Sequence, residues 1–119
     1  MSLNIDIKYN EEKNFWHVIP SGEIDIYTSS KFKDALIEKL KEKESDILID
    51  GEKLEYLDST GLGALISILK TTKENEHKVY LKNIKPNIRK LFDITDLDKV
   101  FIFKEWRDEE RYYYINYSQ

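Results

Sequence analysis

Strand-like and helix-like hydrophobic patterns alternate along this chain of 119 residues. Residues 3–9 alternate apolar and polar side chains, which predicts a strand with one buried face. A short polar loop separates this strand from a second run at residues 15–19, and so short a loop predicts an antiparallel hairpin. Strands then alternate with helices, as they do in parallel sheets. The predicted fold class is therefore α/β, a single domain with an N-terminal β-hairpin, then βα units, and a mixed sheet on which the helices pack.

Beyond the hairpin, the pattern predicts three more strands and three helices. Pro20-Ser21-Gly22 is expected to interrupt the second strand, and residues 23–27 then follow either as a resumed strand or as the approach to a helix. Thr28, Ser29 or Ser30 is expected to cap the first helix. An extended stretch at residues 54–57 leads into the second helix. The predicted strands are 46–50, 78–81 and 100–103. The first predicted helix has its apolar residues at 32–40 and a solvated end at 41–44, the second spans 62–72, and the third starts at Pro86.

Composition argues against several classes of protein. The sequence contains no cysteine, which excludes disulfides, cysteine metal sites and thiol catalysis. His17 and His77 show no metal-ligand spacing, so structural roles are expected for both. The net charge of −4 argues against a nucleic-acid partner, which would need a basic surface. No apolar stretch approaches the ~20 residues that span a bilayer, and the N-terminus shows no signal pattern. We therefore expect a cytoplasmic protein with no membrane partner.

The C-terminal residues differ in character from the rest of the chain. Residues 1–104 contain every predicted element of the domain, whereas residues 105–119 are first charged and then rich in tyrosine. We expect this tail either to pack on the domain, as an added strand or turn, or to contact a partner, and packing is the favoured interpretation.

One polar segment, Leu57-Asp58-Ser59-Thr60-Gly61-Leu62-Gly63, lies between the extended stretch and the second helix. Its structural interpretation is a helix cap, with Ser59 or Thr60 accepting a bond from a free N–H group while the two glycines allow close packing. Its functional interpretation uses the same geometry. A phosphate on an exposed Ser59 would meet free N–H groups and the positive end of the helix dipole. Together with Asp58, it would repel a partner surface that fits a neutral hydroxyl.

The same motif, Asp58-Ser59-Thr60-Gly61-Leu62-Gly63, resembles the phosphorylation motif of the STAS-domain anti-sigma factor antagonists. Three other segments also resemble signatures of that family: one ahead of the first helix, one in the strand ahead of the phosphorylation site, and one in the third-helix region. These segments are 22–25 with 27–28, 47–50, and 88–97. The likeness runs from about residue 3 to residue 103 with every element in order, and it is greatest for the family's general-stress branch.

The resemblance implies a binding module and not an enzyme. In this family, the unphosphorylated antagonist binds an anti-sigma factor that is also a serine kinase, and a sigma factor is thereby released for transcription. The kinase phosphorylates the motif serine, here Ser59, and a serine phosphatase restores it. The residues expected by resemblance to bind the partner are Asp25, Thr28, Asp58, Thr60, Gly61 and Leu62. ATP and Mg²⁺ belong to the kinase, so no cofactor or metal is expected in this chain, and we expect a monomer or a weak dimer.

Two other functions stay open. The first is a Mg-dependent aspartyl phosphoryl receiver, which would use Asp25, Asp50 and Asp58 near the ends of strands. Against it, such receivers need paired acids after their first strand, and here a hairpin comes first. The second is a STAS scaffold or sensor in a larger regulatory assembly, in which Ser59 is a helix cap and no phosphorylation switch operates.

Overall fold

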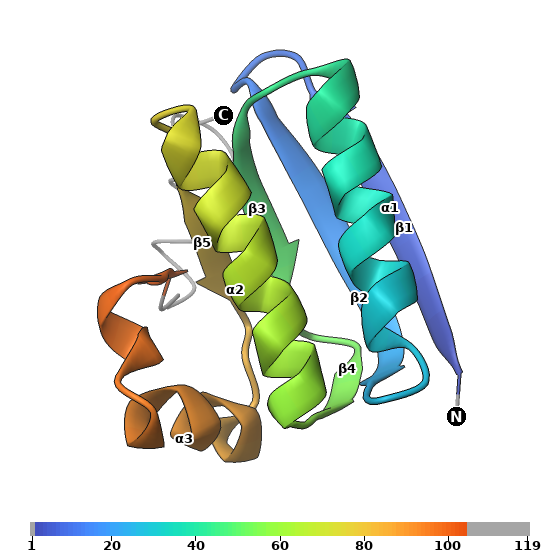
Figure 1. Ribbon diagram of the computed structural model, residues 1–119, viewed down its shortest axis with the longest axis vertical. Helices are drawn as coiled ribbons and strands as arrows, with labels where there is room; N and C mark the ends of the chain where they lie inside the picture. Colours follow the sequence, from blue (N-terminus) through green and yellow to red (C-terminus); the bar gives the residue numbers. More distant parts are fainter. Residues whose placement is uncertain (1, 105–119) are drawn as a thin grey trace.

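The computed structural model describes residues 2–104 of the chain (Figure 1). These residues form six strands, three α-helices and one short 3-10 helix, η1. In chain order the elements are β1 (Leu3–Asn10), β2 (Phe15–Ile24), α1 (Ser29–Glu42), β3 (Asp46–Asp50), β4 (Leu54–Leu57), α2 (Ser59–Glu74), β5 (Val79–Lys82), α3 (Pro86–Ile94), η1 (Leu97–Lys99) and β6 (Ile102–Lys104). The predicted α/β class, with its N-terminal hairpin and following βα units, is confirmed. The tail predicted at 105–119 lies outside the described residues, so that division of the chain stays a prediction.

The strands form one mixed sheet, as predicted. Its order is β1-β2-β3-β5-β6, and β4 pairs with β2 beyond the end of β3. β1 and β2 are antiparallel, with Leu3 opposite Gly22, whereas every other pair is parallel. The short loop at residues 11–14 permits the antiparallel pair, and the helices supply the longer crossovers that parallel pairs need.

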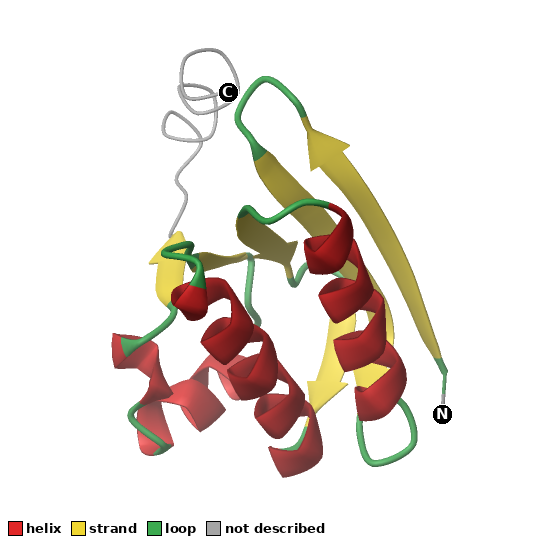
Figure 2. Ribbon diagram, turned by 45° about the horizontal axis from the view of Figure 1, so that its top comes forward, coloured by secondary structure: helices red, strands yellow, loops and turns green. Residues whose placement is uncertain are grey.

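The core lies between the sheet and the helices. Figures 1 and 2 show α1 and α2 side by side over one face of the sheet. Each helix buries the residues that its apolar spacing predicts, such as Phe32 and Leu36 in α1 and Leu65 and Ile68 in α2. A buried side chain of this size contributes about 1.5–3 kcal/mol to folding. This burial fixes α2 on the sheet. The N-terminus of α2 carries the candidate site.

The prediction that Pro20-Ser21-Gly22 interrupts the second strand is wrong. β2 continues through these residues to Ile24, with a register shift between Gly22 and Glu23. β2 pairs with β3 only through residues 15–18 and with β4 only from residue 22, so residues 19–21 have no parallel neighbour. A proline is tolerated here because its missing N–H removes no bond to a neighbouring strand.

The extended stretch at residues 54–57 is a full strand, β4, which the sequence pattern did not count as one. Its two end residues, Leu54 and Leu57, are buried, while the two between them are exposed. That pattern does not alternate, so it lacks the usual period of a half-buried strand. β4 matters for function because it delivers the chain directly to the polar segment ahead of α2.

Candidate functional site

The candidate site lies where the carboxyl ends of β2 and β4 meet. The two strands are parallel, with Ile24 opposite Leu57. The Asp58 N–H donates a hydrogen bond to the Ile24 carbonyl at 3.3 Å, which ties the two chain segments together just beyond the strands. Each strand is followed by a helix: β2 leads into α1, and β4 leads into α2. The predicted site residues Asp25 and Asp58 are thereby placed on adjacent strand ends.

Asp58 is the N-cap of α2. Its Oδ1 accepts hydrogen bonds from the Thr60 N–H at 2.9 Å and the Gly61 N–H at 3.1 Å. The same oxygen accepts a bond from the Thr60 hydroxyl at 2.6 Å. This hydroxyl, followed by the two N–H groups, holds the pKa of the Asp58 carboxyl below its usual value. The predicted cap by Ser59 or Thr60 is therefore wrong, because the carboxylate that precedes both already satisfies the N–H groups of the first turn.

Ser59 occupies the first position of α2 and is exposed. Its hydroxyl makes no hydrogen bond within residues 2–104, whereas the Thr60 hydroxyl is held by Asp58. We expected free N–H groups around a phosphate on Ser59. Two of them are already bonded, because the N–H groups of Thr60 and Gly61 donate to Asp58. A phosphate on Ser59 would therefore stand beside a carboxylate, with its charge facing solvent.

Asp25 and Thr28 form a buried brace in the turn between β2 and α1. Asp25 Oδ1 accepts bonds from the N–H groups of Tyr27, at 2.9 Å, and Thr28, at 3.2 Å. The Thr28 hydroxyl donates to the Glu23 carbonyl at 2.7 Å and accepts from the Asp25 N–H at 2.9 Å. Thr28 lies at the N-cap position of α1 but makes no side-chain capping bond, so the expected hydroxyl cap of this helix is not formed.

This brace turns two apolar side chains outward. Ile26 is 68% exposed and Tyr27 is 81% exposed, although Asp25 and Thr28 on either side are buried. Sequence reasoning missed both residues, because residues 23–27 alternate as a resumed strand would. The available signal was their place between two residues that favour turns.

Gly61 and Leu62 face inward. A Cβ atom on Gly61 would lie 2.7 Å from the Ile24 carbonyl oxygen and 2.5 Å from Leu57 Cδ1, so only glycine lets α2 approach the strand ends this closely. Leu62 belongs to the hydrophobic core. Of the residues expected to bind a partner, only Asp58 and Thr60 therefore lie at the surface beside Ser59. The other four are buried, and their direct contact with a partner stays a prediction.

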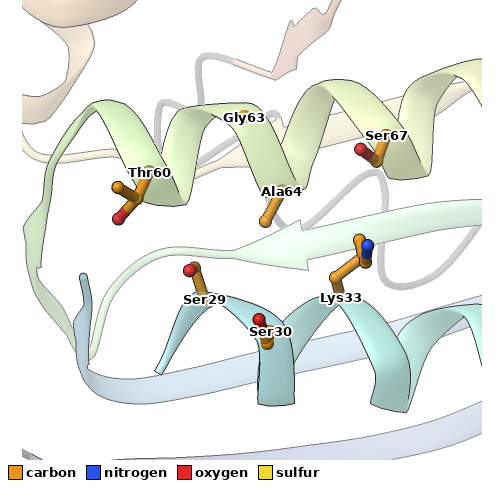
Figure 3. A pocket seen from close by; sticks show the side chains of 7 residues that line it. All are labelled: Ser29, Ser30, Lys33, Thr60, Gly63, Ala64 and Ser67. Carbon is orange, nitrogen blue, oxygen red and sulfur yellow. The ribbon is translucent and has the colours of Figure 1, made fainter. Parts of the chain in front are cut away.

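A shallow groove of about 180 Å³ lies between the first turns of α1 and α2 (Figure 3). Seven residues line it: Ser29, Ser30, Lys33, Thr60, Gly63, Ala64 and Ser67. Gly63 faces open space, since a Cβ added there would meet no atom within 4 Å. The expectation that this glycine serves close packing is therefore wrong, and Gly63 instead lines the groove beside Thr60.

The three acids of the receiver hypothesis serve separate structural roles. Asp25 braces a turn, Asp58 caps α2, and Asp50 Oδ1 accepts bonds from the Glu52 N–H and the Asn83 side-chain amide. Within residues 2–104, no group of three acidic or histidine side chains could hold a metal ion. The described geometry thus offers no support for a metal-dependent receiver. In the same part of the chain, every helix is too short or too polar to cross a membrane.

Comparison with known proteins assigns this chain to a family. A family model of the STAS domain matches residues 6–110, and the chain belongs to this family. More particularly, the chain is similar to the anti-sigma-B factor antagonist of Staphylococcus aureus strain NCTC 8325. The two are 30% identical over 108 residues, which cover 91% of this chain and 100% of the relative.

Solved structures show the same fold. An anti-sigma factor antagonist from Mycobacterium paratuberculosis superposes with a TM-score of 0.74 at 25% identity, over 93% of this chain and 92% of that one. The Bacillus cell fate determinant SpoIIAA, solved in its phosphorylated form, superposes with a TM-score of 0.71 at 17% identity, over 95% of this chain and 100% of that one. The STAS fold expected from the sequence is confirmed by these likenesses.

Proposed function

We propose that this protein is an anti-sigma factor antagonist of the cytoplasm, and that phosphorylation of Ser59 switches off its binding to an anti-sigma factor with serine kinase activity. One observation carries the proposal: the Ser59 hydroxyl is exposed at the start of α2, beside the carboxylate of Asp58, and makes no hydrogen bond to any residue between 2 and 104. The names of the staphylococcal relatives support the class of partner. The phosphorylated form of SpoIIAA supports the idea that this fold can carry a phosphate.

The geometry favours Ser59 over Thr60 as the phosphate acceptor. The Thr60 hydroxyl donates to Asp58 Oδ1 at 2.6 Å, so a kinase would have to break this charge-assisted bond before transfer. The Ser59 hydroxyl has no such bond to lose. In the transfer, the Ser59 oxygen bonds to the γ-phosphorus of ATP, ADP leaves, and the hydroxyl proton passes to a base of the kinase. A serine phosphatase would reverse the modification by hydrolysis.

The phosphate would add charge to a surface that includes polar and apolar side chains. Thr60 and Gly63 lie along the exposed face of α2, and Ile26 and Tyr27 project from the turn between β2 and α1. A phosphate adds a charge of about −1.5 to −2 next to the carboxylate of Asp58. A buried charge mismatch at an interface costs about 2–5 kcal/mol, or roughly thirty- to several-thousand-fold in affinity. This change is large enough to release a partner.

The buried residues of the site act through shape in this proposal. Asp25 and Thr28 fix the turn that presents Ile26 and Tyr27, while Gly61 and Leu62 fix the start of α2 against the strand ends. Their contribution to partner binding is therefore indirect.

The test has two parts. With the partner kinase and ATP, wild type and Thr60→Val should each gain one phosphate, Ser59→Ala should gain none, and mass spectrometry of peptides should locate the phosphate on Ser59. In binding measurements, Ser59→Ala should bind the anti-sigma factor as the wild type does, and Ser59→Asp should bind at least tenfold more weakly. Equal binding by Ser59→Asp and wild type would favour the scaffold or sensor alternative, in which Ser59 carries no switch.

A further inference from the structure

β1 forms an open edge of the sheet. It stands first in the strand order, and among the described residues it pairs only with β2 (Figure 1). A strand of eight residues with one open edge presents main-chain N–H and C=O groups that another strand can bind.

The register with β2 decides which main-chain groups point outward. The Glu23 N–H donates to the Ser2 carbonyl, and Leu3 stands opposite Gly22, so the even-numbered residues of this segment exchange bonds with β2. The odd-numbered residues Ile5, Ile7 and Tyr9 therefore direct their main-chain groups away from the sheet. The Leu3 carbonyl follows this rule, because it accepts a hydrogen bond from the Lys31 ammonium at 2.9 Å and not from β2.

The side chains of β1 are divided between two faces. Those of Ile5, Ile7 and Tyr9 are half-buried and pack against the core on the helix-covered face. Those of Asp6 and Lys8 are exposed on the opposite face. The edge thus combines free main-chain groups, a partly covered apolar row and two opposite charges spaced two residues apart.

We propose that this edge binds a second copy of the chain, by antiparallel pairing of the two β1 strands about a two-fold axis at Ile7. In this register Ile7 faces Ile7, and Ile5 faces Tyr9, so the outward main-chain groups of both copies meet. Asp6 then lies directly opposite Lys8 of the second copy, and the symmetry repeats the pair. Both pairs occupy positions of the closely spaced type, where opposite charges stabilise a sheet.

Charge selects this register over its neighbours. The outward main-chain groups of the two copies can meet only if odd-numbered residues face odd-numbered residues. The neighbouring registers that satisfy this condition are displaced by two residues in either direction. One such shift places Asp6 against Asp6, and the opposite shift places Lys8 against Lys8, and both juxtapose like charges. The chosen register also sets the half-buried Ile5, Ile7 and Tyr9 against the same residues of the second copy, which continues the apolar row across the axis. The contact is small, so the dimer is weak.

The test is a set of charge exchanges followed by sedimentation velocity. Wild type should rise in mass from 14.2 kDa toward twice that value as its concentration increases to about 1 mM, the weak end of the affinity scale. Asp6→Lys should raise the dissociation constant about tenfold or more, because two opposite-charge pairs become like-charge pairs. The double exchange Asp6→Lys with Lys8→Asp should restore association, because it restores both pairs with their signs reversed.

A mixing experiment tests the proposed register. Asp6→Lys and Lys8→Asp should each associate poorly alone but should bind one another, since every pair in the mixed dimer has opposite charges. Circular dichroism should confirm that all variants keep the wild-type fold, and both positions are exposed, so the exchanges leave the core intact. A constant mass of 14.2 kDa for wild type, unchanged association of Asp6→Lys, or failure of the double exchange to restore association would each overturn the proposal.

Discussion

At the residue scale, one oxygen of Asp58 both caps α2 and holds the Thr60 hydroxyl, which favours Ser59 over Thr60 as the proposed phosphate acceptor. Its Oδ1 accepts three hydrogen bonds, two from main-chain N–H groups and one from the Thr60 hydroxyl. We expect Asp58→Ala to lower the free energy of unfolding by about 1 kcal/mol, the usual cost of a lost N-cap. Urea unfolding at neutral pH measures this loss.

Asp58→Asn is the matched control, because its side-chain oxygen can accept the same bonds and asparagine caps helices as well as aspartate does. It should therefore stay within a few tenths of a kcal/mol of the wild type. If Asp58→Ala proved as stable as Asp58→Asn, the capping bonds described here would contribute nothing to the fold.

Two glycines of one motif are expected to respond oppositely to the same substitution. A Cβ on Gly61 would press on the Ile24 carbonyl at 2.7 Å, so Gly61→Ala should cost about 1–3 kcal/mol, as other overpacked sites do. A Cβ on Gly63 would meet nothing, so Gly63→Ala should stabilise α2 by up to about 1 kcal/mol through helix propensity. Thermal unfolding of both variants and of the wild type measures the two changes in stability. A stability loss in Gly63→Ala would contradict the open space seen around this residue.

At the element scale, the turn between β2 and α1 should depend on one hydroxyl. Thr28 donates to the Glu23 carbonyl and accepts from the Asp25 N–H inside a buried turn. Thr28→Val keeps the shape but leaves these groups unpaired, so we expect a loss of about 1–3 kcal/mol in the free energy of unfolding. Thr28→Ser retains the hydroxyl and is the control. Denaturant unfolding of the pair tests the assignment: Thr28→Ser should lose less stability than Thr28→Val, and a loss in Thr28→Val no larger than that in Thr28→Ser would contradict it.

The elements themselves were largely predictable from sequence, and the site only partly. Period-two alternation identified β1, and helical spacing identified the buried face of α1, because burial sets both patterns. β4 was not predicted as a strand, because its end residues are buried and its middle residues are exposed, which breaks the alternation typical of a strand. The motif around Ser59 does lie at the start of α2, as its sequence indicates, but its cap was assigned to the wrong residue. Sequence does not show which of several adjacent oxygens reaches the free N–H groups, since that depends on the angle at which β4 enters α2.

The exposed apolar residues beside the site were the hardest to predict, because their exposure depends on the whole turn. Ile26 and Tyr27 are apolar, and apolar residues are normally assigned to the core. The bonds that Asp25 accepts from the N–H groups of Tyr27 and Thr28 hold the turn in which both side chains point outward. Conversely, Leu62 lies within the motif but faces the core, because the helix that starts at Ser59 carries it to the buried side.

At the scale of the whole molecule, the packing of β2 between two neighbouring strands should make folding sensitive to pH through His17. Burial, followed by the nearby Lys82 charge, lowers the pKa of His17 below its usual value, although Asp50 and Asp6 oppose this shift. Below the unfolded pKa of about 6.5, the unfolded chain binds a proton that the folded chain does not, so stability falls as the pH falls through this range. The loss attributable to His17 should stay below about 1.4 kcal/mol per pH unit, the limit for one proton.

His17→Gln should remove this part of the pH dependence, because glutamine does not titrate. Urea unfolding between about pH 7.5 and pH 5.5 spans the pKa of an unfolded histidine and measures the slope directly. His77→Gln is the control: His77 pairs with Asp46 outside β2, so the contribution of His17 should persist in that variant. Since β2 holds β1, β3 and β4 in one sheet, protonation of His17 should lower global stability and not merely loosen one loop. An identical slope in wild type and His17→Gln would mean that other groups set the acid sensitivity of the fold.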